Sequence, residues 1–264
     1  MEVRFLEKDK EKHKLSFIIK GINYTLANLL RRSMIEEVPV IAVEDVEFRK
    51  NNSILYDEII AHRLGLVPFT TDLKSYNLQE KCKCKGKGCA KCTLKMILKA
   101  KGSGTVYASD IKTKDPKVKP VYPKMPIVKL LKNQDLELEA VMVLGKGKEH
   151  TKWSPCLCYY KYKPVIEITK NVSNPEELVK VCPVNIFELK DKKVVINKDN
   201  LLKCHLCRAC VETSDAVKLT EKDDEFVFYV ESWGQLGCKE IVIEALNIFK
   251  EQLQDFEKGV KEIK

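Results

Sequence analysis

The first forty residues show two kinds of hydrophobic spacing, one after the other. Leu15, Phe17 and Ile19 occupy every second position, which is the spacing of a half-buried strand over residues 13–20. From residue 22 the apolar positions recur every three or four residues and predict a helix. Pro39 ends that helix, because the residue before a proline is pushed out of the α region. The apolar positions of the helix are Ile22, Leu26, Leu29, Leu30, Met34 and Val38.

Strand patterns and loops dominate the middle of the chain. Residues 40–49 resume the strand pattern, and residues 54–66 predict a helix that ends at Gly65 and Pro68. Prolines recur between residues 112 and 126, where they exclude a regular helix and favour an extended path. Further strand-like runs lie at 94–100, 136–144, 163–169 and 193–196.

The end of the chain has the most regular helical pattern. Its apolar residues repeat in steps of four and three over nearly three heptads, and Lys, Glu and Gln fill the other faces. These residues are Val242, Leu246, Phe249, Leu253, Phe256, Val260 and Ile263. Such a stripe has to be covered, either by the rest of its own domain or by a partner that brings a matching helix. The stripe alone favours neither.

Length and composition narrow the class of protein. The 264 residues suffice for two or three domains. The chain lacks an apolar run of about eighteen residues, so we expect no membrane span, and it lacks a secretory signal, so we expect a cytoplasmic protein. The net charge of +9 comes from 47 basic and 38 acidic residues spread along the chain. This distribution favours a solvated Lys/Glu-rich surface over a DNA-reading face.

Eight of the eleven cysteines fall into two groups. In a chain without a signal peptide, metal or cluster ligation is a better explanation of this pattern than disulfides. Cys204, Cys207 and Cys210 form a CxxCxxC run, and Cys182 stands directly before Pro183. These cysteines are the remaining parts of a two-cluster ferredoxin pattern, in which each half reads CxxCxxCxxxCP and the last cysteine of one half ligates the cluster of the other.

The rest of the two-cluster pattern has lost its ligands. Val172, Pro175 and Leu178 occupy the upstream ligand positions, and residues 214–215 replace the downstream Cys-Pro. The sequence therefore predicts a single iron–sulfur cluster, either 4Fe-4S or, after loss of the iron held by Cys182 from its separate loop, 3Fe-4S. We expect a structural cluster with a possible redox-sensing use, because ligation supplies folding energy that a lobe with a small core lacks.

The second cysteine group has the spacing CxCx4CxxC. Four thiolates close together suit a tetrahedral zinc ion, and Gly86 and Gly88 let the backbone turn so that the sulfurs converge. The group consists of Cys82, Cys84, Cys89 and Cys92. Such a closed site would be structural. Disulfides and a partly filled site are the alternatives. The five lysines between residues 81 and 91 are expected to be solvated, and the remaining Cys156, Cys158 and Cys238 to be buried or free thiols.

The sequence carries no signature of catalysis. It lacks a P-loop, a GxGxxG after a strand and a GxSxG, and its four histidines do not pair at metal-binding spacing. Two non-catalytic functions could explain the cysteine motifs. An electron-transfer iron–sulfur protein is suggested by the cluster motif alone, and a zinc-bearing nucleic-acid module would need a concentrated basic face with aromatic residues.

A long segment resembles a known family. Residues 31–68, RRSMIEEVPVIAVEDVEFRKNNSILYDEIIAHRLGLVP, are similar to the signature of the α-like subunits of cellular RNA polymerases. The similarity extends to SDIK, PVYPKMPIVKLLKNQ, GKGKEHTKWSP at 145–155 and the C-terminal helix. Within this family the chain most resembles the archaeal members, which are relatives of the third subunit of eukaryotic polymerase II and of bacterial α. Some archaeal members carry an inserted ferredoxin-like domain.

The resemblance implies an α+β fold with three parts. Residues 1–45 and 223–264 would form a discontinuous dimerisation domain, residues 46–169 a mostly β inserted domain with the Cys-rich loop, and residues 170–222 a ferredoxin-like iron–sulfur domain. The chain would be part of a DNA-directed RNA polymerase, a nucleotidyltransferase, without catalytic residues of its own.

The resemblance also implies partners. The chain would form a heterodimer with the small α-like subunit L, and the pair would be the platform for the large catalytic subunits. The block 31–68 would face the second-largest subunit, and subunits N and P would be neighbours. Sequence-specific DNA contact is not expected, because the DNA-binding module of bacterial α is absent. The expected interface with subunit L consists of Leu26, Leu29, Leu30, Met34, Phe249, Leu253, Phe256 and Val260.

Overall fold

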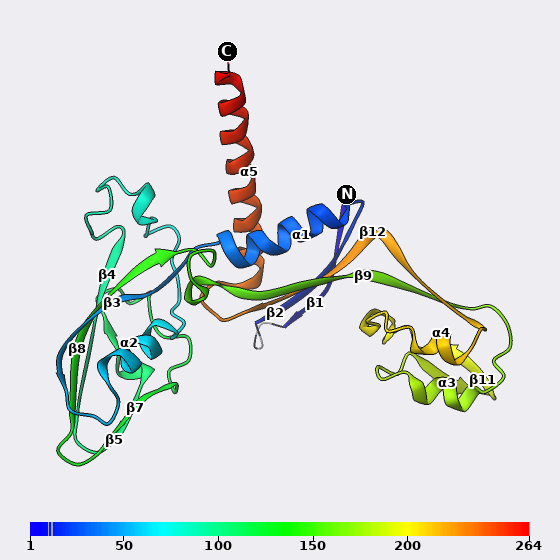
Figure 1. The fold of residues 1–264 in the computed structure, drawn as a ribbon, viewed down its shortest axis with the longest axis horizontal. Coiled ribbons are helices and arrows are strands. Elements are labelled where there is room, and N and C mark those ends of the chain that lie inside the picture. Colours follow the sequence, from blue (N-terminus) through cyan, green and yellow to red (C-terminus); the bar gives the residue numbers. More distant parts are fainter. Residues whose placement is uncertain (10, 12, 264) are drawn as a thin grey trace. The chain divides into compact units, whose positions relative to one another are not determined.

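Helices and strands alternate along the chain in the computed structural model, which describes residues 1–9, 11 and 13–263. The fold is a mixture of α and β elements, as the sequence predicts (Figure 1). Two units can be distinguished. Unit 1 consists of Met1–Lys8, Ser16–Leu29 and Tyr159–Tyr229, and unit 2 consists of Asp9–Leu15, Leu30–Cys158 and Val230–Lys264.

A four-stranded sheet lies mostly in unit 1. Its strand order is β1-β2-β12-β9, where the strands are β1 (Glu2–Asp9), β2 (Lys14–Lys20), β9 (Cys156–Ile168) and β12 (Val217–Ser232). The alternation predicted for residues 13–20 corresponds to β2. Its Phe17 stacks on Phe228 of β12 with ring centroids 5.3 Å apart, so aromatic packing holds these strands together.

The helix α1 (Tyr24–Arg32) follows β2. Asn23 caps its start, because the side-chain Oδ1 of Asn23 accepts a hydrogen bond of 2.9 Å from the backbone N–H of Leu26. The helical pattern predicted from residue 22 continues as a short π-helix, η1 (Ser33–Glu37), before β3 begins at Val40. Pro39 lies between the two elements, which confirms the predicted end of the helix.

A small α/β lobe forms the other half of unit 1. Its elements are α3 (Pro175–Val181), β10 (Phe187–Lys190), β11 (Lys193–Ile196), the 3-10 turn η5 (Leu201–Lys203) and α4 (Ala209–Thr213). β10 and β11 form an antiparallel hairpin, and both turn residues, Asp191 and Lys192, are left-handed, as a type I′ turn requires. The core of the lobe includes Leu178, Ile186 and Phe187.

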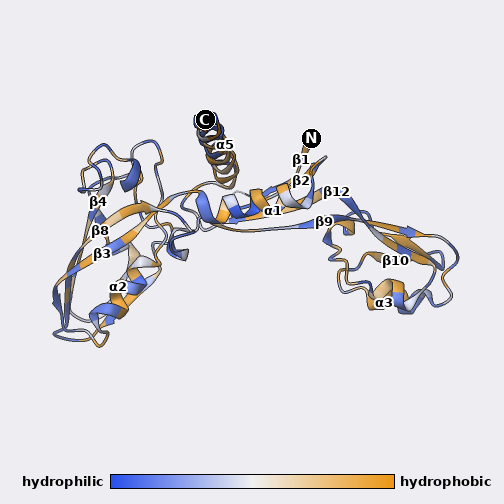
Figure 2. Cartoon of the chain, turned by 45° about the horizontal axis from the view of Figure 1, so that its top comes forward, coloured by the Kyte–Doolittle hydropathy of each residue, from blue (hydrophilic) through white to orange (hydrophobic). Residues whose placement is uncertain are grey.

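A second four-stranded sheet builds unit 2. Its order is β3-β8-β4-β6 and its neighbours are antiparallel, with β3 (Val40–Asn51), β8 (Asp135–Gly145), β4 (Thr93–Lys101) and β6 (Lys112–Thr113). Apolar and polar residues alternate along these strands (Figure 2). Leu94, Met96 and Leu98 of β4 point into the core, where α2 (Asp57–Gly65) contributes Ile60 and Leu64. A separate pair, β5 (Gly104–Tyr107) and β7 (Pro126–Leu130), adds Val106, Ile127 and Leu130 to this core. Short 3-10 turns lie at η2 (Gln79–Lys81), η3 (Ala108–Asp110) and η4 (Thr151–Trp153).

The segment 145–155 wraps closely around its neighbours in unit 2. A Cβ at Gly145 would lie 2.3 Å from the ring of Trp153, and a Cβ at Gly147 would lie 2.2 Å from the carbonyl oxygen of Ile35. Both positions therefore exclude a side chain. The backbone N–H of Lys148 also donates to the carbonyl oxygen of Glu36 at 3.0 Å, so the segment fixes the π-helix η1.

The terminal helix α5 (Cys238–Glu262) is buried only at its start. Ile241 and Ala245 are buried, and this part of the helix packs on η1 within unit 2. From Lys250 to Ile263 every residue is exposed, including the large apolar ones. None of the helices in the described residues is long and apolar enough to cross a bilayer.

Several strands of the structure are not predicted by the hydrophobic pattern. β1, β5, β7, β10 and the long β12 have no counterpart among the predicted strands, and β9 begins at Cys156 rather than at residue 163. The predicted helices and the strands at 40–49, 94–100, 136–144 and 193–196 are confirmed within a few residues. The Lys/Pro-rich stretch up to residue 126 contains no helix beyond the short turns, as predicted.

Candidate metal centres

Four thiols converge in the loop before β4, in unit 2. Their sulfur atoms all lie within 4.8 Å of one another. The Sγ atoms are 3.6 Å apart in the pair Cys82–Cys89, 3.5 Å in Cys84–Cys92 and 3.9 Å in Cys89–Cys92. The corners of a zinc–thiolate tetrahedron with Zn–S bonds of about 2.3 Å would be about 3.8 Å apart. The four side chains therefore fit a tetrahedral ion, and these separations exceed a disulfide bond of about 2 Å.

The backbone of this loop bends so that the four sulfur atoms converge. Lys85, Gly86 and Gly88 have left-handed φ angles of 54°, 78° and 81°, which reverse the chain twice within four residues. The backbone N–H of Cys89 donates to the Sγ of Cys92 at 3.3 Å. Such hydrogen bonds to sulfur orient a ligand and lower its negative charge. The two outer cysteines of the motif are almost fully buried, with 5% of Cys82 and 1% of Cys92 exposed.

The thiols of the loop do not titrate alike. Burial raises the pKa of Cys92 to about 12. Burial opposes ionisation of Cys84 as well, but hydrogen bonds from Cys92 and Cys82 outweigh it and lower the pKa of Cys84 to about 6. One thiolate can thus form near neutral pH, and a metal ion would have to displace the protons of the buried thiols.

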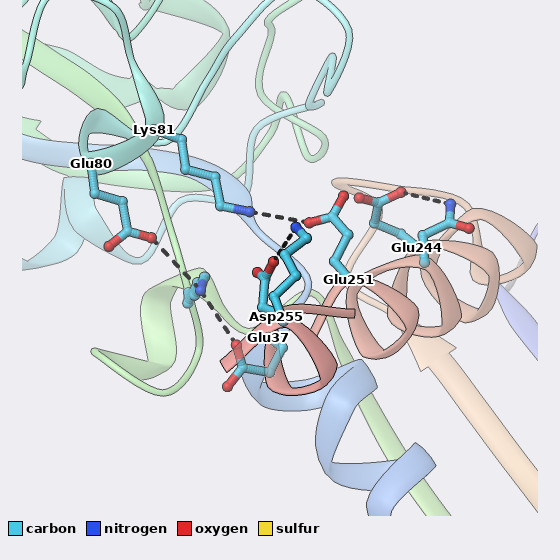
Figure 3. Close-up of polar contacts among 9 residues, drawn as sticks. Glu37, Glu80, Lys81, Glu244, Glu251 and Asp255 are labelled. Carbon is cyan, nitrogen blue, oxygen red and sulfur yellow. Dashed lines mark hydrogen bonds and ion pairs between the residues drawn. The ribbon is translucent and has the colours of Figure 1, made fainter. Parts of the chain in front are cut away.

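Ion pairs anchor the start of the loop to the rest of unit 2. Lys81 Nζ lies 3.2 Å from Glu251 Oε2 on α5 (Figure 3). Lys146 Nζ lies 3.4 Å from Glu37 Oε2 and 3.8 Å from Glu80 Oε1, so it bridges η1 and the residue before Lys81. Ion pairs thus hold the start of the loop, and a backbone hydrogen bond of 2.8 Å from Asn77 to the carbonyl oxygen of Lys91 holds its end.

The other four cysteines lie around one pocket in the lobe of unit 1. Cys182 follows α3, Cys204 and Cys207 belong to the loop before α4, and Cys210 lies in α4. Cys204 and Cys210 are buried, and burial raises the pKa of both thiols. The walls of the pocket are mostly apolar and consist of Ile166, Val184, Ile186, Phe187, Ala209 and Leu219, with His205 at its exposed side.

Backbone geometry at this pocket suits sulfur ligands. The backbone N–H of Leu206 donates to Cys204 Sγ at 3.4 Å, and that of Ile186 donates to Cys182 Sγ at 3.5 Å. Leu206 and Arg208 are left-handed, so the loop bends around the pocket. Hydrogen bonds to sulfur and a dry cavity are the features that tune iron–sulfur clusters. The four predicted ligands thus line one apolar pocket, and two of them accept a backbone hydrogen bond at sulfur.

The positions of the missing ligands are filled by packing. Leu178 is fully buried in the core of the lobe, and Val172 packs against that core. Pro175 is the first residue of α3, where a proline is well tolerated. Lys170 pairs with Asp215, the residue at the place of the lost Cys-Pro proline, at 2.5 Å. Leu178 and Val172 thus pack in or against the core, and Asp215 forms an exposed ion pair.

The three remaining cysteines do not form a ligand group in the described residues. Cys156 and Cys158 are buried, as predicted, and burial raises the pKa of Cys158 to about 12. The Sγ of Cys156 donates to the carbonyl oxygen of Met34 at 3.7 Å, and that of Cys238 to the carbonyl oxygen of His13 at 2.9 Å. These thiols tie segments of unit 2 together.

The residues expected at a partner interface differ in their exposure. Leu253, Phe256 and Val260 of α5 are exposed, and 71% of Phe256 is accessible. Phe249 and the three leucines of α1, Leu26, Leu29 and Leu30, are partly exposed. Met34 is buried within its own chain, with 2% exposed, so it supports η1 from inside.

The basic residues are less evenly distributed than the balance of the whole chain suggests. Residues 46–155 contain 22 basic and 11 acidic residues, whereas the rest of the chain contains 25 basic and 27 acidic ones. The positive charge of the protein therefore resides in the segment that carries the Cys-rich loop. The net charge of the full chain does not reveal that the basic excess lies in this segment.

Comparison with known proteins gives consistent results over the whole length. The family model described as RNA polymerase Rpb3/RpoA insert domain matches residues 46–155. The DNA-directed RNA polymerase subunit Rpo3 of Methanosphaera stadtmanae is 37% identical over 99% of both chains. The Rpo3 subunit of Methanosarcina mazei is 39% identical over 97% of this chain and 96% of its own, and that of Pyrococcus furiosus is 36% identical over 97% and 95%.

Proposed function

The chain belongs to the archaeal Rpo3 family of DNA-directed RNA polymerase subunits, and on this premise we propose that its task is assembly. In this role it is a non-catalytic subunit that forms a heterodimer with the small α-like subunit L. The pair is the platform on which the large catalytic subunits of the transcription machinery are placed.

The exposed end of α5 is the observation that carries this proposal. Leu253, Phe256 and Val260 form an apolar stripe on a helix of which no residue beyond Phe249 is covered by the described part of the chain. Exposing such side chains to water is unfavourable by about 25 cal/mol per Å² of apolar surface. A partner that brings a matching helix would remove this cost. The partly exposed leucines of α1 are proposed as further contacts of the same partner.

The other proposed contacts follow from the family. The block 31–68 would face the second-largest subunit, and subunits N and P would be further neighbours. Exposed apolar residues of this block support a protein contact, since Ile54, Tyr56, Ile59 and Leu66 are all accessible.

Both metal centres are proposed to be structural. The lobe of unit 1 would be a ferredoxin-like domain that holds one iron–sulfur cluster on Cys182, Cys204, Cys207 and Cys210, with redox sensing as an additional use. Zinc rather than disulfides is proposed for the Cys-rich loop, because the four sulfurs lie within 4.8 Å of one another and three of their separations are 3.5, 3.6 and 3.9 Å. Each ion would supply folding energy to a segment with few core residues.

The test is a binding experiment with purified subunit L. The unchanged chain is expected to form a stable one-to-one complex, measured by isothermal titration calorimetry and analytical ultracentrifugation. The double variant Leu253→Ser/Phe256→Ser removes two exposed anchors and is expected to weaken binding at least about 30-fold, the loss expected for hot-spot residues of about 2 kcal/mol or more.

The matched control is Asp255→Ser/Lys258→Ser. These two residues pair with each other at 2.9 Å on the polar side of α5, so removing both leaves no unpaired charge. The control is expected to bind subunit L as the unchanged chain does. Equal weakening by both double variants, or no complex with the unchanged chain, would contradict the proposed dimer.

A further inference from the structure

Residues 46–155, called the insert segment below, include a stretch without any acidic residue. Between Glu80 and Asp110 the sequence contains no Asp or Glu, but it contains eight lysines. Five of them lie in the Cys-rich loop and three in β4.

Several lysines of unit 2 pair with carboxylates on neighbouring strands or loops. Lys99 of β4 lies 2.5 Å from Glu137 of β8, and Lys50 of β3 lies 2.6 Å from Asp135. Lys117, in the loop that follows β6, lies 2.8 Å from Asp72. Carboxylates thus neutralise part of the positive charge here, whereas Lys95 and Lys101 of β4 form no ion pair with a described residue.

The lysines of the Cys-rich loop have no such partners. Lys81 pairs with Glu251 (Figure 3), but Lys83, Lys85, Lys87 and Lys91 form no ion pair with any described residue. All four are exposed. The cysteines between them converge on one point, so four unpaired like charges lie within nine residues of one short loop. Such a cluster attracts a polyanion, most strongly at low ionic strength.

The side chains of the loop indicate which anion. Protein interfaces are enriched in Tyr, Trp and Arg and depleted in Lys, whereas the loop offers Lys with only Gly and Ala between the cysteines. Lysine ammonium groups act as point charges on phosphates without demanding a fixed geometry. We propose that the loop 81–92 contacts the phosphodiester backbone of nucleic acid through Lys83, Lys85, Lys87 and Lys91, without reading bases.

This inference goes beyond the assembly role and needs no aromatic face. Aromatic residues stack on bases, and contacts that involve phosphates alone do without them. The net charge of the insert segment adds a general attraction that brings the polyanion to the loop.

The experiment measures binding of the full-length chain to three fluorescein-labelled probes between 50 and 200 mM KCl. The probes are a 20-nucleotide RNA, the same sequence as single-stranded DNA, and its duplex, followed by fluorescence anisotropy. The variant Lys83→Gln/Lys85→Gln/Lys87→Gln/Lys91→Gln is expected to lose at least tenfold in affinity at 50 mM KCl. The slope of log K against log salt is expected to fall by up to about 2.8 for single strands and about 3.6 for the duplex, as counterion release predicts for four phosphate contacts.

The matched control removes the same number of charges from lysines that have carboxylate partners. It is Lys14→Gln/Lys50→Gln/Lys99→Gln/Lys117→Gln, in which each lysine forms an ion pair in the structure. Its salt slope is expected to stay within about one unit of that of the unchanged chain. Thermal melting checks that both variants remain folded. Equal losses in the two variants would mean that net charge alone binds the probes, and would overturn the proposal.

Competition separates the polymer classes. Poly-glutamate of matched charge is expected to compete weakly. If it competes as well as RNA, and does so only while the four loop lysines are present, the loop is a site for an acidic protein segment and the proposal fails. Stronger binding of RNA assigns the site to a transcript, and stronger binding of the duplex assigns it to DNA. Binding of subunit L is measured on the same variants, so a failure here and a failure of the proposed dimer are distinguishable.

Discussion

At the scale of single residues, Glu225 shows how a nearly buried charge is held in unit 1. Its carboxylate accepts a hydrogen bond from Lys163, and Lys20 lies 3.9 Å away. Only about a tenth of its side chain is exposed. The hydrogen bond from Lys163 lowers the pKa of Glu225 below its ordinary value of 4.5, although burial acts in the opposite direction. Water screens this pair little, so it is worth more than a surface ion pair.

The sign of the pKa shift fixes a pH dependence. A carboxylate with a lowered pKa in the folded state contributes stability above its unfolded pKa and loses it as the pH falls through the folded one. Glu225→Gln is therefore expected to destabilise unit 1 by about 1–2 kcal/mol at pH 7 and by less at pH 3.5. Thermal melting at the two pH values measures this. Glu231→Gln, whose partner Lys14 is half exposed, is the control and is expected to change little. A constant difference at both pH values would contradict the assignment.

Single residues also show what sequence reasoning can find. Both sets of cysteines can be found from their spacing in the sequence. Metal ligands must lie close together in space, and residues a few positions apart in the chain are close together in any fold. The lysines at 83, 85, 87 and 91 are visible in the same sequence, but the absence of carboxylates beside them depends on which strands become neighbours. The buried position of Met34 could not be predicted either. An apolar stripe on a helix does not indicate whether a residue in it packs within its own chain or against a partner.

At the scale of elements, the pattern of hydrophobic residues predicts an element best where one face is buried. Residues 226–230 of β12 are nearly all buried, but residues 218–224 of the same strand are mostly exposed and charged, so the strand pattern is weak there. The strand pattern predicts β9 only from residue 163, whereas the strand begins at Cys156 and contains Pro164. The sheet order places β9 at an edge, where a proline costs no ladder hydrogen bond on its outer side.

The two halves of α5 are expected to differ in their importance for the fold. A chain ending at Lys250 loses only exposed residues and the ion pair between Lys81 and Glu251, so its melting temperature is expected to stay within about 3 °C of the full chain. A chain ending at Glu240 also loses the buried Ile241 and Ala245 and is expected to melt at least about 8 °C lower. Calorimetry on both truncated chains measures this. A large loss in the first chain would show that the end of α5 is covered by the chain itself.

At the scale of the whole molecule, the two metal centres lie in different units, so their loss should act locally. Cys204→Ser is expected to lower the iron content and the protection of amides in residues 170–216 from hydrogen exchange. Cys92→Ser is expected to lower the zinc content and the protection of residues 77–93, where Asn77 donates to the carbonyl oxygen of Lys91. Metal analysis and hydrogen exchange by mass spectrometry measure both effects.

Each cysteine variant is the control for the other. Loss of protection across both units in either variant would contradict the independence of the two centres. Unchanged protection around Cys204, with the iron content lowered, would contradict a structural role for the cluster.

The family and the fold class could be predicted from the sequence because residues 31–68 are so distinctive, but no pattern in the chain could predict the division into two units.

The packing of Leu178 has an evolutionary consequence. A leucine stands where the two-cluster pattern has a cysteine, and it is fully buried in the core of the lobe. At this position the lobe is held by packing alone, which needs no supply of metal. The walls around the four remaining cysteines are also apolar, so joint replacement of the four by apolar residues would extend the same kind of packing. Under the proposed single cluster, such a replacement would give a lineage in iron-poor or oxygen-rich habitats a subunit that folds without iron.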